Sequence, residues 1–366
     1  MPTASVEFCR GLKKCELHAH LNGSIRISTL QEFLSAAQQR EPWREDLKGL
    51  QVKHLKSRTL DECFEFFGKY SVAPRPLGVP LTSCVDIIYK VVTSPSQITR
   101  IMIETLEDFT ADNVAYAEIR TTPRHDIMDA EEYIEACVKG IQEFERINHR
   151  SNRAASKHCP TAARLLLSIG RSFALTVAME TVRLAEKYAK SCGNYVVGVD
   201  VSGNPKKGEF ATFLPALEKA RKAGLPVSVH CGEVHNPFEV DQILKFKPDR
   251  LGHALIMDKS HLSTLERNNI PIEVCPTGNM ITLELDNLRQ HPVLARCLRQ
   301  GYPISLNTDD SVLFGTTLSE EYFRVSSAFL LSKQDVKRLA CRAWNDIFDR
   351  PFLVQFRRTN HSPAAL

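Results

Sequence analysis

The chain has 366 residues, of which 43% are apolar and 25% charged, a composition typical of a globular protein. This composition excludes a disordered chain, and the length suits one large domain or two average ones. The formal net charge of +4 is too small to indicate a nucleic-acid or membrane partner, and no uninterrupted apolar stretch is long enough to span a bilayer.

The cysteines are scattered along the chain, and because there are 11 of them they cannot all pair within it. No secretory apolar segment opens the sequence, and residues 1–14 look like a short tail. We therefore expect free thiols and a cytosolic location.

Eight short runs of β-branched and apolar residues recur along the chain, with amphipathic stretches such as 178–190 and 213–223 between most of them. The runs lack strict alternation, as expected of strands covered on both faces. In chain order they are 15–20, 114–120, 164–169, 195–201, 225–230, 250–254, 270–275 and 302–307.

This alternation of strand and helix predicts a parallel sheet, and eight units in one chain predict a (β/α)8 barrel. A doubly wound open sheet is the alternative, although no Gly-x-Gly-x-x-Gly run follows an early strand. We expect a single domain over residues 1–366, with an irregular insertion at 68–85 and an exposed loop at 150–160.

The unusual polar residues fall at the carboxyl ends of the predicted strands. Because these ends meet at one face of a barrel, residues far apart in the sequence are expected to become neighbours there. In chain order they are His18, His20, His230, Glu233, His253, Asp309 and Asp310.

A metal site is the first prediction from this pattern. His18 and His20 are two positions apart on a strand, so both imidazoles face the same side. With His230 and Asp309 they provide nitrogen and oxygen ligands suited to zinc, and we predict one Zn²⁺ per chain. Zinc would lower the pKa of a bound water to about 7.

The remaining polar residues at this face have chemical roles of their own. Glu233 is suited to donate and accept protons, His253 to orient the water or stabilise charge, and Asp310 to accept a substrate N–H. Each has an ordinary alternative, since a buried strand histidine is usually a satisfied core group and Asp-Asp after a strand is commonly a helix N-cap. The joint pattern over four strand ends favours the metal site.

Other histidines lack this placement, and strand alternation turns Cys231 away from the predicted site. We treat the following as surface residues: His54, His125, His235, His261 and His291.

Six segments together resemble the adenosine/AMP deaminase superfamily, and most of all its branch acting on N6-methyl-AMP, particularly the plant enzymes. They are ELHAHLNGS (16–24), AEIRTTP (117–123), VDVSGNP (199–205), HCGEV (230–234), LGHA (251–254) and NTDD (307–310). The resemblance implies a zinc barrel with the ligands His18, His20, His230 and Asp309. The implied reaction converts N6-methyl-AMP and water to IMP and methylamine.

The resemblance also implies individual roles around the purine. Glu233 matches the residue that protonates N1, and His253 matches the one that positions the attacking oxygen. Asp310 matches the group that holds N7, and Gly203 the backbone donor to N3. His20 is expected to face the substrate as well as the metal.

Asn22 bears on the choice between nucleoside and nucleotide. Similar nucleoside deaminases carry Asp here, and a carboxylate would repel a 5′-phosphate to which a neutral amide can donate. We therefore predict a nucleoside monophosphate, although Asn22 also reads as a simple turn residue. Arg58 and Thr59, which precede an amphipathic pattern, are further candidate phosphate donors, as are Ser24 and Arg120.

Two departures from the family pattern keep alternatives open. Gly170-Arg171-Ser172 stands where similar sequences have Asp-Arg-Arg, and both CPTGN (275–279) and NTDD look closer to nucleoside deaminases. An adenosine deaminase that forms inosine is one alternative, and a catalytically inactive barrel that binds a partner is another. We expect a monomer with a small purine nucleotide substrate.

Overall fold

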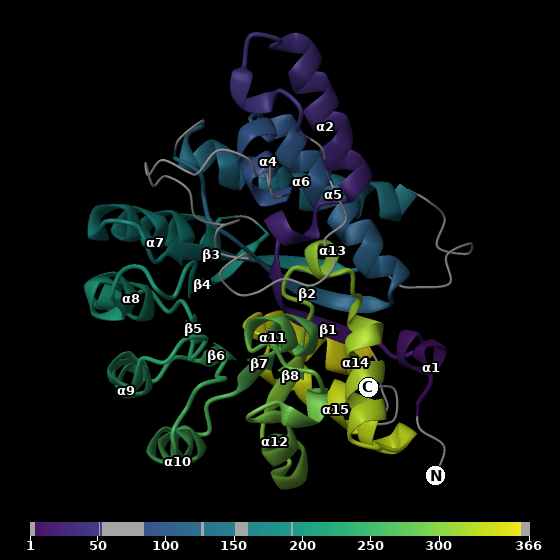
Figure 1. Cartoon of the computed structure of the whole chain (residues 1–366), viewed down its shortest axis with the longest axis vertical. Coiled ribbons are helices and arrows are strands. Elements are labelled where there is room, and N and C mark those ends of the chain that lie inside the picture. The colour runs from purple at the N-terminus through teal and green to yellow at the C-terminus, as the bar shows by residue number, and fades with distance from the viewer. Residues whose placement is uncertain are drawn as a thin grey trace.

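The structure, a computed structural model, describes residues 4–50, 52, 84–125, 128–150, 160–191 and 193–359. Its centre is one sheet of eight parallel strands in chain order (Figure 1). The strands are β1 Lys14–His20, β2 Val114–Thr121, β3 Ala162–Gly170, β4 Val196–Ser202, β5 Val227–Cys231, β6 Arg250–His253, β7 Ile272–Val274 and β8 Ile304–Leu306. Each lies at one of the eight predicted runs, so the (β/α)8 prediction is confirmed and the open-sheet alternative is wrong.

The barrel closes at its carboxyl end between β1 and the residues that follow β8. The N–H of His20 donates to the carbonyl of Asp309 at 2.9 Å, and the N–H of Asp309 donates to the carbonyl of His18 at 2.8 Å. These bonds place residues from opposite ends of the chain side by side, where the predicted metal ligands lie.

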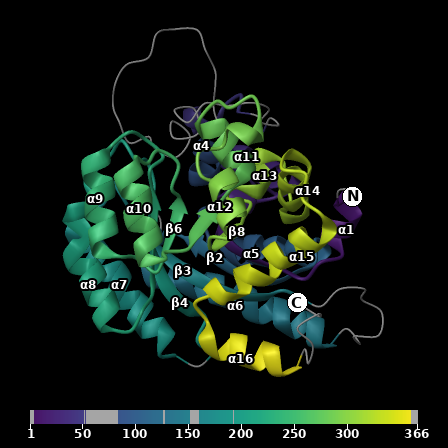
Figure 2. The same cartoon turned by 90° about the horizontal axis from the view of Figure 1, so that it is seen from below.

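Helices surround the strands, with α7 to α10 on one side and α14 and α15 on the other (Figure 1). The larger helices are α2 Ile27–Arg40, α4 Cys84–Val91, α5 Pro95–Ala111, α6 Ala130–Arg150, α7 Leu175–Ala189, α8 Leu214–Lys222, α9 Pro237–Phe246, α10 Lys259–Asn268, α14 Leu318–Ala328, α15 Lys333–Ala343 and α16 Arg350–Thr359. The short ones are α1 Val6–Arg10, α11 Pro276–Thr282, α12 Leu294–Gln300 and α13 Ser311–Phe314. Figure 2 shows α16 beneath the barrel, where Phe352 stacks on Tyr116 of β2.

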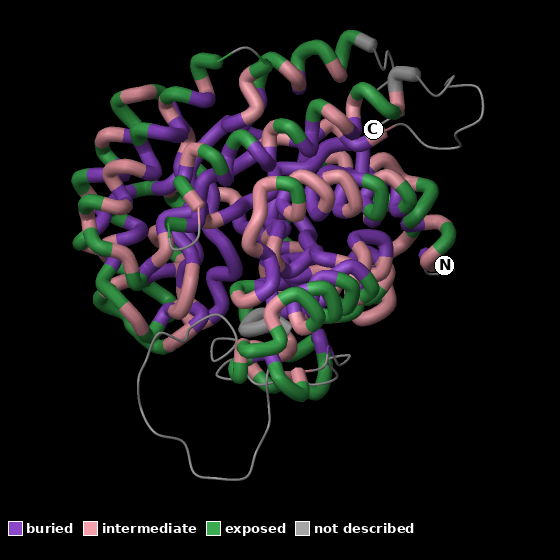
Figure 3. The backbone as a smooth tube through the Cα atoms, turned by 90° about the horizontal axis from the view of Figure 1, so that it is seen from above, coloured by how far each residue is buried: buried purple, intermediate pink, exposed green. Residues whose placement is uncertain are grey.

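Burial explains why the strands carry almost no polar alternation. Every residue of β2 and β4 is buried, because the barrel interior covers one face and the helices cover the other. Figure 3 shows buried residues in the centre and exposed residues along the outer helical faces. No helix in the described part of the chain is both long enough and apolar enough to cross a membrane.

Two local predictions need comment. Residues 6–10 form α1, whose N-cap Ser5 accepts from the N–H of Phe8 and whose Cys9 is buried, so the expected tail is wrong. One helical turn is too short to show a period in the sequence. Most of the predicted insertion and loop, namely 68–83 and 151–159, lies outside the described residues, and α4 already begins at Cys84.

Candidate active site

Three imidazoles and a carboxylate meet at the carboxyl end of the barrel. The Nε2 atoms of His20 and His230 are 3.2 Å apart, and Oδ1 of Asp309 lies 3.4 Å from Nε2 of His20 and 3.5 Å from Nε2 of His18. A tetrahedral zinc site with bonds of about 2.0–2.1 Å has ligand–ligand edges of ~3.3–3.4 Å. Three of the distances between these donors therefore match the edges of a tetrahedral site, and the nitrogen and oxygen donors suit zinc.

The second nitrogens of two of these rings are held by buried carboxylates. Nδ1 of His18 lies 2.5 Å from Oε2 of Glu273, and Nδ1 of His230 lies 3.2 Å from Oδ1 of Asp200. A carboxylate only accepts, so each Nδ1 carries the proton and each Nε2 presents its lone pair to the centre of the group. Among the described residues, Nε2 of His18 has no hydrogen-bond partner although it is fully buried.

The charge states of the rings suit metal ligation. Burial holds the pKa values of His18 and His20 well below the usual range, so both rings are neutral. Burial opposes the charged form of His230 too, but the attraction of Asp200 outweighs it and raises the pKa of His230. The same attraction makes His230 a more basic ligand.

Arg120 joins the two supporting carboxylates inside the barrel. Its Nη1 lies 3.0 Å from Oδ1 of Asp200, its Nη2 lies 2.6 Å from Oε2 of Glu273, and the residue is fully buried. The suggestion that Arg120 contacts a phosphate is therefore wrong, because its strand position turns the side chain inward. Asp200 and Glu273 were missed, although a carboxylate inside a short apolar strand is the signal that identifies them.

The carboxylates at the mouth of the site are crowded and buried. Burial raises the pKa of Glu233, so this group retains its proton at a higher pH than an ordinary glutamate. Burial and the negative charge of Glu233 raise the pKa of Asp310 to about 7. Burial and Asp310 raise the pKa of Asp309 well above its usual range, which a bound cation would offset.

Asp310 is not the helix cap that its position suggests. It precedes α13 but its side chain makes no capping hydrogen bond, and its buried Oδ1 has no partner within the described ranges. A Cβ at Gly23 would lie 1.8 Å from this oxygen, so only glycine lets the carboxylate reach its place beside β1. This oxygen therefore lies buried and without a partner against Gly23.

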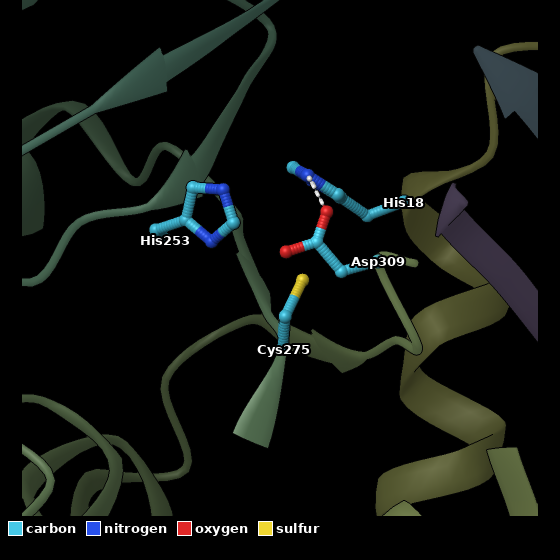
Figure 4. A group of neighbouring side chains, drawn as sticks. All are labelled: His18, His253, Cys275 and Asp309. Carbon is cyan, nitrogen blue, oxygen red and sulfur yellow. Dashed lines mark ion pairs between the residues drawn. The ribbon is translucent and has the colours of Figure 1, made fainter. Parts of the chain in front are cut away.

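A second group of potential ligands overlaps the first. Figure 4 shows His18, His253, Cys275 and Asp309 pointing toward one another from four different strand ends, and their ligand atoms all lie within 4.8 Å of one another. Cys275 was not foreseen here. Burial raises the pKa of its thiol well above the usual range, and a protonated thiol is a poor ligand.

Strained backbone holds His253 in this group. His253 and Ala254 have φ angles of 63° and 55°, in the left-handed region that residues other than glycine rarely adopt. Its Nε2 lies 3.8 Å from Oε1 of Glu233. The turn after β6 therefore directs the imidazole toward the predicted proton donor.

The other candidate residues are placed as follows. Asn22 is half-buried directly after β1, and Gly203 follows β4 with a φ of 100° that favours glycine. Ser24 donates through Oγ to the carbonyl of His20 at 2.9 Å, so it is engaged within the fold. Arg58 and Thr59 lie outside the described residues.

The unusual Gly170 ends β3. A Cβ on Gly170 would lie 3.2 Å from the ring of Phe173, which therefore occupies the space beside this position. The neighbouring Arg171 is buried and forms an ion pair with Glu239 of α9. The ring of Phe173 thus lies where the carboxylate expected from similar sequences would begin.

The default assignment of the remaining histidines to the surface is partly wrong. His125 and His235 are exposed, whereas His54 lies outside the described residues. His261 is buried, with Nε2 3.2 Å from Asp241 and Nδ1 accepting from the N–H of Asp258. His291 is also buried, beside Asn279.

Comparison with known proteins agrees with this geometry. The family model described as adenosine deaminase matches residues 13–349. The chain belongs to the adenosine deaminase family. It is 35% identical over 365 residues to the N6-mAMP deaminase of Arabidopsis thaliana, covering 94% of both chains, and 30% identical to the human N6-Methyl-AMP deaminase, covering 93% of this chain and 90% of that protein.

Solved structures give the same relationship. The crystal structure of arabidopsis ADAL complexed with IMP superposes with a TM-score of 0.80 at 34% identity, over 98% of this chain and 100% of that one. The barrel and the family together make this chain a hydrolytic purine deaminase.

Proposed function

We propose that this chain converts N6-methyl-AMP and water to IMP and methylamine, with one zinc ion bound by His18, His20, His230 and Asp309. The observation that carries the proposal is the convergence of these four donors, three of whose separations match a tetrahedral site, beside the buried carboxyl group of Glu233. The names of the curated relatives support the choice of substrate.

The metal, when bound, supplies the Lewis acidity that makes water a nucleophile near neutral pH. Glu233 enters the reaction protonated, because burial raises its pKa, and gives its proton to N1 of the purine as C6 is attacked. His253 is placed to donate a hydrogen bond to the incoming oxygen. The bond from C6 to the methylamino nitrogen then breaks. Of the two protons of the attacking water, one leaves on methylamine and the other restores the protonated form of Glu233.

Two further residues hold the purine. N7 is a hydrogen-bond acceptor, so Asp310 must be protonated to bind it, and its pKa of about 7 allows this near neutral pH. The earlier expectation that Asp310 accepts a substrate N–H is less suited to N7. Gly203 supplies its backbone N–H to N3.

Asn22 is proposed to distinguish nucleotides from nucleosides. It lies directly after β1, two residues beyond His20, and its amide can donate to a 5′-phosphate without charge repulsion. We propose Arg58 and Thr59 as further hydrogen-bond donors to the same phosphate.

We also propose one domain over residues 1–366, a monomer and a cytosolic location. All seven cysteines whose side chains the structure describes are free thiols, as a reducing compartment would maintain them.

The test is turnover by the purified, zinc-loaded protein, with kcat/KM compared for N6-methyl-AMP, AMP and adenosine. We expect N6-methyl-AMP to be preferred and IMP to form together with methylamine. A higher kcat/KM for adenosine would establish the adenosine deaminase alternative, which CPTGN and NTDD favour. A protein with one zinc per chain and no turnover of any of the three would contradict the proposal.

A further inference from the structure

We propose that Asn279 is a positioning residue, which fixes His253 as the neutral tautomer protonated on Nε2 and so makes His253 a hydrogen-bond donor into the active site. The structural part of this inference stands by itself. Its kinetic consequence rests on the proposed deaminase function.

The orientation of the Asn279 amide follows from a backbone group. Asn279 lies in α11 and is fully buried, and the N–H of Cys275 donates to its Oδ1 at 3.1 Å. A backbone N–H can only donate, so the atom that faces it must be the amide oxygen. With the amide reversed, its NH₂ group would meet the N–H of Cys275 donor to donor.

The other end of the amide meets His253. Nδ2 of Asn279 lies 2.9 Å from Nδ1 of His253. An amide NH₂ group donates and does not accept, so Nδ1 of His253 must be the acceptor and carries no proton. A neutral imidazole has one N–H, which therefore sits on Nε2, the atom 3.8 Å from Oε1 of Glu233.

His291 provides a second, independent check on the same amide. The N–H of Leu294 donates to Nδ1 of His291 at 3.3 Å, so Nε2 of His291 carries the proton. That Nε2 lies 3.1 Å from Oδ1 of Asn279, which thus accepts two hydrogen bonds. Backbone donors at Cys275 and Leu294 set the direction of every bond between them.

This arrangement distinguishes the two histidines in Figure 4. His18 presents a bare Nε2 because Glu273 accepts from its Nδ1, whereas His253 presents a protonated Nε2 because Asn279 donates to its Nδ1. A protonated nitrogen cannot bind a metal. His253 is therefore a donor beside the metal cluster rather than a ligand within it.

The test is Asn279→Asp, which keeps the shape of the side chain and an oxygen for the N–H of Cys275. The second carboxylate oxygen can only accept, so His253 is expected to move its proton to Nδ1 and leave Nε2 bare. We expect kcat to fall on the order of 10²–10⁴-fold with little change in KM, as when the tautomer-setting residue of a serine protease is exchanged between carboxylate and amide. Zinc content is expected to remain one per chain.

Asn113→Asp is the matched control. Asn113 is also buried and donates through Nδ2 to the carbonyl of Leu12 at 3.1 Å, but it lies before β2, at the end of the barrel away from the site. The same chemical change there is expected to leave kcat within about twofold of the parent. If kcat fell equally in the two variants, the loss would be explained by general destabilisation of the fold, and the proposal would be overturned.

A readout independent of turnover is ¹⁵N NMR of histidine-labelled, zinc-loaded protein, with His253 assigned by its loss in His253→Gln. We expect an unprotonated Nδ1 in the parent and a protonated Nδ1 in Asn279→Asp. A protonated Nδ1 in the parent overturns the proposal whatever the activity. If the parent has the expected tautomer but deaminates no purine, the proposed function fails and the tautomer assignment stands.

Asn279→Ala serves as a second variant if the aspartate prevents folding. It adds no charge and leaves Nδ1 of His253 without the amide donor. We expect a mixture of the two tautomers and a smaller fall in kcat than for the aspartate. An unchanged single tautomer in a folded Asn279→Ala protein would also overturn the proposal.

Discussion

His18 and His253 lie with ring centroids 4.6 Å apart, yet their Nδ1 atoms face partners of opposite kind. Glu273 accepts a hydrogen bond from Nδ1 of His18, and the amide of Asn279 donates a hydrogen bond to Nδ1 of His253. Both rings are buried, and burial lowers both pKa values well below the usual range. The residues behind the site thus decide which imidazole offers a lone pair and which offers a proton.

Replacing Glu273 by glutamine is expected to weaken zinc binding. The variant loses the carboxylate that holds the proton of His18 on Nδ1 and that accepts from Arg120 and Arg250 at 2.6 Å each. Losing such a supporting carboxylate typically lowers metal affinity by about 10–100-fold. Competition with a zinc-binding chelator measures the change.

Asp349→Asn is the control for this prediction. Asp349 is buried and accepts from Nε of Arg164 at 2.6 Å, but neither residue contacts the histidines. Zinc affinity that falls as much in Asp349→Asn as in Glu273→Gln would show that loss of a buried ion pair, and not the orientation of His18, is responsible.

Glu233→Gln is expected to lower kcat by roughly 10²–10⁴-fold while zinc stays bound, because glutamine cannot deliver a proton to N1. The pH dependence has a definite sign. Burial raises the pKa of Glu233, and the protonated form is the active one, so kcat of the parent should fall as pH rises through that raised pKa. Steady-state kinetics from pH 5 to 9 with a metal assay at each point tests both statements. Full activity in Glu233→Gln would assign the proton to another group.

The strands and the residues that face the centre of the site could be predicted because their sequence signals are local. A short apolar run identifies a strand, and a polar residue at its carboxyl end identifies a member of the barrel face, as His18 and Asp309 illustrate. The residues that hold the histidines in place could not be predicted in this way, because their roles depend on which side chains meet inside the barrel. Arg120 was named as a candidate phosphate donor because its strand neighbours do not reveal that Asp200 and Glu273 lie opposite it.

Asn279 and His291 were missed for a related reason. Asn279 was recognised within CPTGN only as part of a family pattern. The spacing of residues along the sequence does not reveal a hydrogen bond to a residue of another strand. His291 lies between short helical segments without periodicity, and it is buried beside Asn279 of α11 and Leu294 of α12. Residues that position others are therefore less visible in a sequence than residues that react.

Asn22→Asp is expected to shift preference from nucleotide to nucleoside. A carboxylate beside a 5′-phosphate repels it, whereas a 5′-hydroxyl can donate to a carboxylate. We expect kcat/KM for N6-methyl-AMP to fall by about 10–100-fold, with that for N6-methyladenosine unchanged or raised, an energy of roughly 1.4–2.8 kcal/mol. Equal losses for both substrates would place Asn22 away from the phosphate and restore its interpretation as a turn residue.

His291 should make stability depend on pH in a predictable direction. Burial lowers its pKa from 6.5 to about 4, so between these values the unfolded chain binds a proton that the folded chain does not. The neutral ring therefore contributes to the free energy of unfolding, and this contribution is fully present above pH 6.5. It declines as pH falls toward 4, by at most about 1.4 kcal/mol per pH unit. His291→Gln removes this titration. Between pH 7 and pH 5 the free energy of urea unfolding of the zinc-saturated variant should therefore fall by roughly 2 kcal/mol less than that of the parent.

The exposed His235 provides the control His235→Gln, which should follow the parent. If all three proteins lose the same free energy over this interval, His291 is not the buried neutral donor that the bond to Asn279 requires.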